Sequence, residues 1–147
     1  MDKGIYCLVF SNNPCTIQVG SLGPRDFPRG WHAYIGSALG HGGFSRVSRH
    51  IRLFSSGSGK RHWHIDYLLT NQGFSLHCAV CAPTASPLEC NLARAIGGIP
   101  VPHFGSSDCR CPSHLFYFDT NPRDRITSGA VSLGLVPFIT TINTLER

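Results

Sequence analysis

The sequence predicts a mixed α/β fold, because short apolar runs typical of strands alternate with segments of helical periodicity. The strand-like runs, rich in β-branched and aromatic residues, are 4–10, 15–20, 31–38, 74–82 and 114–118. Helices are expected at 44–54, at 64–71 and from about 87 to 96. A chain of 147 residues accommodates one compact domain but is too short for two of ordinary size.

The first half of the chain alternates strands with turns and then passes into a helix. The run GIYCLVF is followed by the turn SNNP, and the second strand leads into the breaker-rich stretch GSLGPRDFPRG. After the strand at 31–38, the glycine-rich segment GHGG precedes the helix at 44–54. That helix has one apolar stripe at spacings of three and four residues, which consists of Phe44, Val47, Ile51 and Phe54.

The start of the third helix carries a capping pattern. Ser86 is expected as the N-cap and Glu89 as its capping-box partner, with Pro87 in the first turn. The glycine pair that follows Ile96 is expected to end the helix. Beyond it, the sequence predicts a loop at 104–113, a turn at 121–125 and an apolar tail whose pattern fits either helix or strand.

The chain carries a net charge of +5, and 11 of its 13 basic residues are arginine. Because a guanidinium grips phosphate in two places, nucleic acid is a candidate partner, although charge alone fits a basic domain without a ligand equally well. No apolar run approaches the ~20 residues of a membrane helix, and no signal peptide is evident, so a cytoplasmic protein is expected. The predicted DNA-contacting side chains are Arg49, Arg52, Lys60, Arg61, His62, His64, Ser107 and His114.

Seven cysteines are many for a cytosolic chain, and their odd number argues against a disulfide framework as the first interpretation. The pairs Cys78/Cys81 and Cys109/Cys111 together have zinc-ligand spacing. However, Cys78 and Cys81 lie in an expected buried strand, where residues three apart point to opposite faces. Structural zinc is therefore the less favoured hypothesis.

Several polar residues occur at positions that two strands and a helix would bring together. Tyr6 and Tyr34 each lie in a predicted strand and are the tyrosines of the tripeptides GIY and YIG. Arg46 and His50 are four residues apart and so share one helical face, next to the apolar stripe. Glu89 begins a separate helix, where a capping role alone would explain it.

These segments resemble the GIY-YIG nuclease superfamily. GIY at 4–6, YIG at 34–36, Arg46 with His50, and the isolated Glu89 carry the resemblance. More narrowly, YIGSALGHGG, RVSRH, HWHIDYLL, LECNLA and FGSSDCRCPSHL resemble a mainly archaeal branch, whose members are sometimes fused to endonuclease III-like DNA glycosylases. The match covers residues 4–118.

The resemblance implies an α+β domain with a central three-stranded antiparallel sheet flanked by helices. An extra hairpin would be added to it, and the domain would span residues 1–119, with residues 120–147 as an extension packed on it. The implied activity is hydrolysis of a phosphodiester in double-stranded DNA with one divalent metal, Mg²⁺ or Mn²⁺. Glu89 would be the metal ligand, Arg46 would bind phosphate, and Tyr6, Tyr34 and His50 would surround the attacking water.

The sequence departs from the family pattern at one point. Many relatives carry an asparagine about a dozen residues after the metal glutamate, where this chain has Pro100-Val101-Pro102. Ser106, Ser107 or His114 would have to replace it.

The fusion of relatives to glycosylases favours abasic or otherwise damaged DNA as the substrate, with a functional link to a glycosylase. Two alternatives stay open: a metal-independent abasic-site lyase acting through a Schiff base on Lys3 or Lys60, and a non-catalytic, zinc-stabilised nucleic-acid-binding module.

Overall fold

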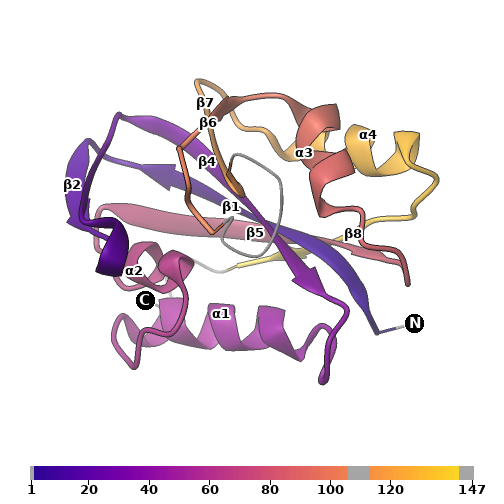
Figure 1. The fold of residues 1–147 in the computed structure, drawn as a ribbon, viewed down its shortest axis with the longest axis horizontal. Helices are drawn as coiled ribbons and strands as arrows, with labels where there is room; N and C mark the ends of the chain where they lie inside the picture. The colour runs from indigo at the N-terminus through magenta and orange to yellow at the C-terminus, as the bar shows by residue number, and fades with distance from the viewer. Residues whose placement is uncertain (1, 106–112, 143–147) are drawn as a thin grey trace.

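A computed structural model describes residues 2–105 and 113–142, and it shows an α+β fold with a central antiparallel sheet between two helical layers (Figure 1). Within the described residues the sheet has six strands in the spatial order β6-β7-β4-β1-β5-β8. They are β1 (Gly4–Asn12), β4 (Gly30–Ala38), β5 (Phe74–Pro83), β6 (Ile99–Pro100), β7 (Leu115–Phe118) and β8 (Phe138–Thr141).

The expectation of a three-stranded sheet is therefore wrong in its strand number. The long strands β1, β4 and β5 form the centre, and each neighbour pairs antiparallel to the next. Short strands extend this centre on both sides, because the outer edges of β4 and β5 would otherwise leave backbone N–H and C=O groups unpaired. Strand β8 pairs with the outer edge of β5, and β7 pairs with the outer edge of β4.

A separate two-stranded hairpin follows β1. It pairs β2 (Cys15–Gln18) with β3 (Pro24–Phe27), and a 3₁₀ turn, η1 (Gly20–Leu22), connects them. An extra hairpin was expected, but β3 lies within residues 20–30. For that stretch the sequence indicates only many glycine and proline residues, which interrupt helices and strands. Pro24 begins β3, a position in a strand where the missing N–H of proline is tolerated.

Helices cover both faces of the sheet (Figure 1). The core under α1 (Ser45–Ser56) and α2 (His64–Leu69) takes the even-numbered side chains of β1, such as Tyr6, Leu8 and Phe10. The core under α3 (Glu89–Ile96) and α4 (Arg123–Ser132) takes Ile5, Cys7 and Val9. The sheet is thus buried on both sides, which explains why β1 is apolar almost throughout.

Two predicted helix boundaries are corrected. Ser86 is not the N-cap of α3: Leu88 occupies that position without a side-chain cap, and the helix begins at Glu89. Residues 121–125 are not merely a turn, since α4 begins at Arg123, where Asn121 accepts a hydrogen bond from the Arg123 N–H at 2.9 Å.

Cys78 and Cys81 lie in β5 and are buried as free thiols. Cys78 packs into the core under α3 and α4, and Cys81 into the core under α1 and α2. Two side chains on opposite faces of a sheet cannot bind the same metal ion. Cys78 and Cys81 therefore do not form a pair of zinc ligands. Cys109 and Cys111 lie outside the described residues.

No helix among the described residues has both the length and the apolar character that a membrane crossing requires.

Candidate active site

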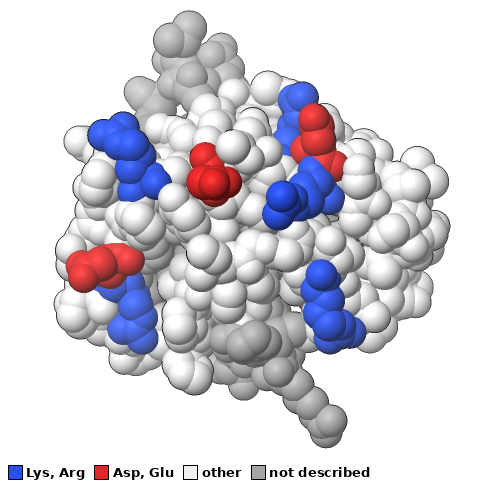
Figure 2. Space-filling model, turned by 90° about the horizontal axis from the view of Figure 1, so that it is seen from above, with Lys and Arg blue, Asp and Glu red and all other residues white. Residues whose placement is uncertain are grey.

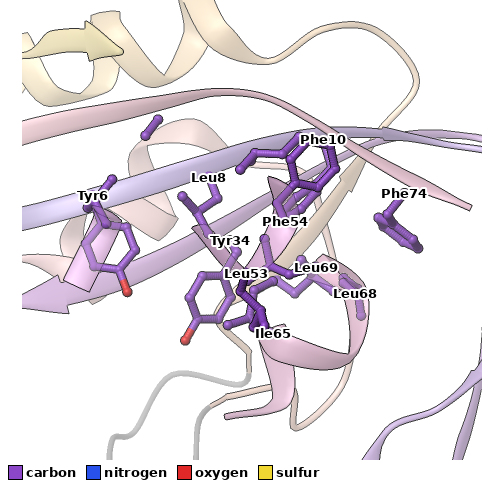
Figure 3. Packing of buried hydrophobic residues seen from close by; sticks show 14 of the residues in the cluster. Tyr6, Leu8, Phe10, Tyr34, Leu53, Phe54, Ile65, Leu68, Leu69 and Phe74 are labelled. Atoms are coloured by element: carbon purple, nitrogen blue, oxygen red, sulfur yellow. The ribbon is translucent and has the colours of Figure 1, made fainter. Parts of the chain in front are cut away.

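Tyr6 and Tyr34 lie side by side on the face of the sheet that α1 and α2 cover. Leu8 pairs with Tyr34 across β1 and β4, so that Tyr6 is two residues further along the same face. Their ring centroids are 6.5 Å apart, and both hydroxyls point in the same direction in Figure 3. The antiparallel register of β1 and β4 thus brings GIY and YIG together.

Gly36 makes room for the Tyr6 ring. It is the cross-strand partner of Tyr6, and a Cβ at Gly36 would collide with the ring carbons and hydroxyl of Tyr6. The glycine of YIG is therefore explained by sterics, because the ring of Tyr6 approaches the backbone of β4 too closely for a side chain at Gly36.

His50 completes a buried pair with Tyr6. The Tyr6 Oη and the His50 Nε2 are 2.8 Å apart, and both side chains are only 1% exposed. The other ring nitrogen, His50 Nδ1, is buried and has no hydrogen-bond partner among the described residues. A buried polar atom without a partner is uncommon and often marks a functional site.

Burial keeps this pair neutral. It raises the pKa of Tyr6 well above its usual value of 10, and nearby Tyr34 adds to this while Arg46 opposes it. Burial also raises the pKa of Tyr34 to about 12 and lowers that of His50 to about 4. At neutral pH Tyr6 is therefore a phenol and His50 an uncharged imidazole, so Tyr6 is suited to orienting a water rather than deprotonating it unaided.

Arg46 extends from α1 toward the same group. Its guanidinium donates a hydrogen bond to the Ser37 carbonyl at 2.8 Å and lies close enough to Tyr6 to lower the pKa of that hydroxyl. It also lies over the Trp63 ring, 4.8 Å from the centroid. Because the side chain is half-buried, part of the guanidinium remains available to a phosphate.

Glu89 lies apart from these four residues, at the start of α3 in the other helical layer. Within residues 2–105 and 113–142, its carboxylate makes no hydrogen bond or salt bridge, but its charge acts on His114, partly opposing the burial that lowers the pKa of that side chain. The His114 carbonyl accepts a hydrogen bond from the Ile35 N–H, next to Tyr34. His114 thus connects Glu89 to the strand that carries Tyr34.

Glu89 fits the ligand of a hard divalent cation. Among the described residues no group of three or more His, Cys, Asp or Glu side chains is placed to hold a metal. Mg²⁺, however, keeps several of its waters and is commonly held by one or two carboxylates. The Glu89 carboxylate has no hydrogen-bond or salt-bridge partner among the described residues, so it could serve as such a ligand.

A family model described as "Domain of unknown function DUF123" matches residues 5–134. The chain belongs to this family. No curated protein and no solved structure matches it. The DUF123 match runs from β1 to just beyond α4 and includes all five of the predicted catalytic residues.

The DUF123 chain has a basic groove along α1. Two hollows of about 330 and 570 Å³ adjoin there, since both are lined by Arg49 and Arg52. The other lining residues are His41, Ser45, Arg46 and Trp63 in the smaller hollow, and Leu53, Ser56, Lys60 and His62 in the larger. No acidic side chain of residues 2–105 or 113–142 lines either hollow. Through Arg46 the groove reaches the candidate active site.

The face seen from above differs from this groove. In Figure 2, Lys and Arg residues stand apart from one another with Asp and Glu between them. That view looks onto the side of the molecule that carries α3 and α4. A polyanion therefore finds a more continuous basic surface along α1 than on this face.

Several of the predicted DNA-contacting residues also have partners within the protein. Arg49 forms a two-point salt bridge with buried Asp66, and both of its N···O distances are 3.0 Å. Arg61 donates to the Thr70 hydroxyl at 3.2 Å, and His64 Nδ1 accepts from the Gly105 N–H at 3.1 Å. Arg52, Lys60 and His62 are exposed, and Ser107 lies outside the described residues.

The sequence leaves two interpretations of the segment 62–67 open: contact with DNA or support of the site, or a helix start with Trp63 in the core. It does not predict which side chains Trp63 and Asp66 contact. Trp63 lies beside both Arg46 and His50, and Asp66 holds Arg49. The spacing Trp63-x-x-Asp66 was the available signal, since an acidic residue three positions after a helix start forms a capping box with the N-cap backbone.

Proposed function

We propose that this DUF123 protein is a metal-dependent DNA endonuclease of the GIY-YIG type, acting at abasic or otherwise damaged sites. The observation that carries the proposal is the convergence of Tyr6, Tyr34, Arg46 and His50 at one end of a basic groove. These residues come from two strands and a helix. Packing alone does not require an imidazole nitrogen that has no partner in the described part of the chain beside two tyrosines and an arginine.

The chemistry of the proposal follows from the side chains. Hydrolysis of a phosphodiester needs charge neutralisation on the phosphate oxygens and an oriented water. Arg46 would bind the phosphate, and Tyr6 would accept a hydrogen bond from the water while it donates its own proton toward His50. Tyr34 would position the phosphate. A divalent cation held by Glu89, Mg²⁺ or Mn²⁺, would supply further positive charge and assist the leaving oxygen.

Abasic DNA suits a shallow basic groove. A nucleotide without its base is unstacked and bends easily, so a surface that holds mainly the backbone can select it by deformability. The resemblance to domains fused with DNA glycosylases supports the same substrate, since a glycosylase produces abasic sites.

A panel of substrates tests this proposal. Intact, abasic and branched duplexes are incubated with the protein in Mg²⁺ or Mn²⁺, with and without EDTA. We expect metal-dependent cleavage that is fastest on the abasic duplex. Equal rates on abasic and intact duplexes at the same salt concentration would contradict the choice of substrate.

The lyase alternative is tested with the same abasic duplex. Lys60 lines the basic groove, where an amine could attack an abasic sugar without metal. Borohydride trapping of a covalent adduct, together with cleavage in EDTA, would replace the hydrolytic proposal by the lyase.

A further inference from the structure

Trp63 packs against the core under α1 and α2 and also lies beside two residues of the candidate active site. Its ring lies 4.8 Å from the Arg46 guanidinium carbon and 5.9 Å from the His50 ring centroid. The guanidinium carbon of Arg49 lies 4.6 Å from the same ring. A tryptophan face attracts cations, so the ring forms a platform for both guanidinium groups.

The platform is itself anchored. The Asp66 carboxylate is fully buried and accepts hydrogen bonds from the backbone N–H groups of His62 and Trp63. It also accepts both hydrogen bonds from Arg49. Asp66 therefore fixes the backbone that carries the ring and also fixes the second cation over the ring.

We propose that Trp63 is a positioning residue that holds the Arg46 guanidinium in the orientation that binds the scissile phosphate, an inference that rests on the proposed function. Arginine has a long, flexible side chain, and ordering it at the moment of reaction is unfavourable. Contacts with Trp63, the Ser37 carbonyl and the Tyr6 hydroxyl order it beforehand. Such preorganisation is the main protein contribution to phosphoryl chemistry.

The position of Trp63 fits this role better than a purely structural one. The ring is only partly buried, and it lines the smaller hollow together with Arg46. It therefore lies on the surface that a phosphate backbone would meet.

Trp63→Leu tests the proposal, and Trp63→Phe serves as the conservative variant. The first readout is the NMR signal of the Arg46 Nε–H, assigned by its loss in Arg46→Gln, because an aromatic ring at this distance shifts it. We expect Trp63→Leu to abolish the shift and also to speed the exchange of this N–H with solvent, because the guanidinium is no longer held, and Trp63→Phe to retain much of both. An Arg46 N–H that exchanges as slowly in Trp63→Leu as in wild type would overturn the proposal.

The second readout is cleavage of the abasic duplex. In Trp63→Leu we expect kcat to fall about 10- to 100-fold while KM changes by less than about threefold, with recovery of most of kcat in Trp63→Phe. The matched control is Trp31→Leu, because Trp31 packs against the opposite core and should leave kcat and the Arg46 signal unchanged. Equal kcat in Trp63→Leu and wild type would overturn the proposal.

The two readouts separate this proposal from the proposed function. If wild-type protein cleaves DNA and Trp63→Leu cleaves equally fast, the function stands and the positioning role is wrong. If the shifted Arg46 signal is present but no DNA is cleaved in any metal, the proposed function fails and the catalytic role of Trp63 fails with it.

Discussion

At the scale of single residues, the pair Tyr6 and His50 belongs both to the buried core and to the candidate active site. A phenol and an imidazole 2.8 Å apart satisfy each other in the core, yet one imidazole nitrogen has no partner in the described part of the chain. Arg46 and the backbone of Ser37 lie at the edge of this pair. The candidate site thus has a neutral, buried interior formed by Tyr6 and His50 and a positively charged edge formed by Arg46. This arrangement suits the orientation of a water molecule next to a phosphate.

Tyr6→Phe should cost both stability and activity. Removing the hydroxyl leaves both ring nitrogens of buried His50 without a partner among the described residues, which lowers the free energy of unfolding by about 1–3 kcal/mol. Urea unfolding measures this loss, and a cleavage assay measures the loss of water orientation. The matched control is Tyr34→Phe, whose hydroxyl makes no hydrogen bond with the described residues and which should change stability by less than about 0.5 kcal/mol. Equal stability of the two variants would contradict the account of the Tyr6–His50 pair.

The buried histidines predict a loss of stability in mild acid. Burial lowers the pKa of His32 and His50 to about 4, while unfolded histidine titrates near 6.5. The unfolded state therefore binds protons first, and stability that is complete above pH 6.5 is lost as the pH falls toward 4. Between pH 7 and 5 we expect a loss on the order of 2 kcal/mol for each of the two.

Urea midpoints at pH 7, 6 and 5 measure this dependence. Carboxylates contribute little in the same interval, because Asp66 has a pKa below its usual value. His50→Gln should remove the part of the dependence that His50 contributes, on the order of 2 kcal/mol. Burial also lowers the pKa of His64, His77 and His114, so these side chains keep part of the dependence in that variant. A midpoint that stays constant from pH 7 to pH 5 would show that these imidazoles are not buried in neutral form.

At the scale of elements, the pairing of β1 with β4 creates the site. The register that places Tyr6 opposite Gly36 also sets Tyr34 two residues away on the same face. Helix α1 then delivers Arg46 and His50 from one helical face.

Gly36→Ala should therefore disrupt the site through sterics alone. Its Cβ would collide with the Tyr6 ring, which has no free space in the core, so the ring or β4 must move. We expect a loss of about 1–3 kcal/mol in thermal or urea unfolding, and loss of cleavage. Gly40→Ala is the matched control, since a Cβ there meets nothing within 4 Å, and it should leave both properties intact. A variant Gly36→Ala that behaves like Gly40→Ala would contradict the register.

The elements that the sequence predicted correctly have strong local patterns. The long strands β1, β4 and β5 and the helix α1 follow from apolar runs and a stripe at helical spacing. Helix α4 was not identified, because residues 121–125 were predicted as a turn and the tail from residue 128 fits either helix or strand. It contains Gly129, and a glycine usually weakens a helix. The structure explains that glycine, since a Cβ there would lie 3.1 Å from Ile96 and 3.3 Å from Leu92, and the close packing on α3 depends on its absence.

The candidate active site, too, could be predicted from the sequence only in part. The meeting of Tyr6, Tyr34, Arg46 and His50 was predicted because the resemblance to the GIY-YIG superfamily implies it, and the helical spacing of Arg46 and His50 agrees with it. The partner of Arg49 was not, since Asp66 lies 17 positions away and reaches it only through the packing of α2 on α1. The edge strands β7 and β8 likewise depend on pairing between distant segments, which no short window of sequence contains.

At the scale of the whole molecule, the predicted catalytic residues are divided between the two helical layers, and the basic groove lies on one of them. The basic groove and four predicted catalytic residues lie with α1, whereas Glu89 lies at the start of α3. A substrate that reaches both must approach near the ends of β4 and α3, where His114 lies.

This charge distribution predicts a local salt dependence of DNA binding. Each exposed cation that neutralises a phosphate adds about 0.9 to the slope of log K against log salt concentration. Arg52→Gln and Lys60→Gln should each reduce the slope by about 1 when binding is measured in EDTA. Arg123→Gln in α4, outside the groove, should leave it unchanged. Equal effects of all three variants would indicate diffuse attraction rather than binding in the groove.

The most direct test of the central claim is the single-turnover cleavage rate of an abasic duplex by wild-type protein and by Glu89→Gln, in Mn²⁺ and in EDTA. The account predicts cleavage by the wild type only with metal, and a rate at least about 100-fold lower for a correctly folded Glu89→Gln. Cleavage by Glu89→Gln at the wild-type rate, or wild-type cleavage that EDTA does not slow, would contradict it.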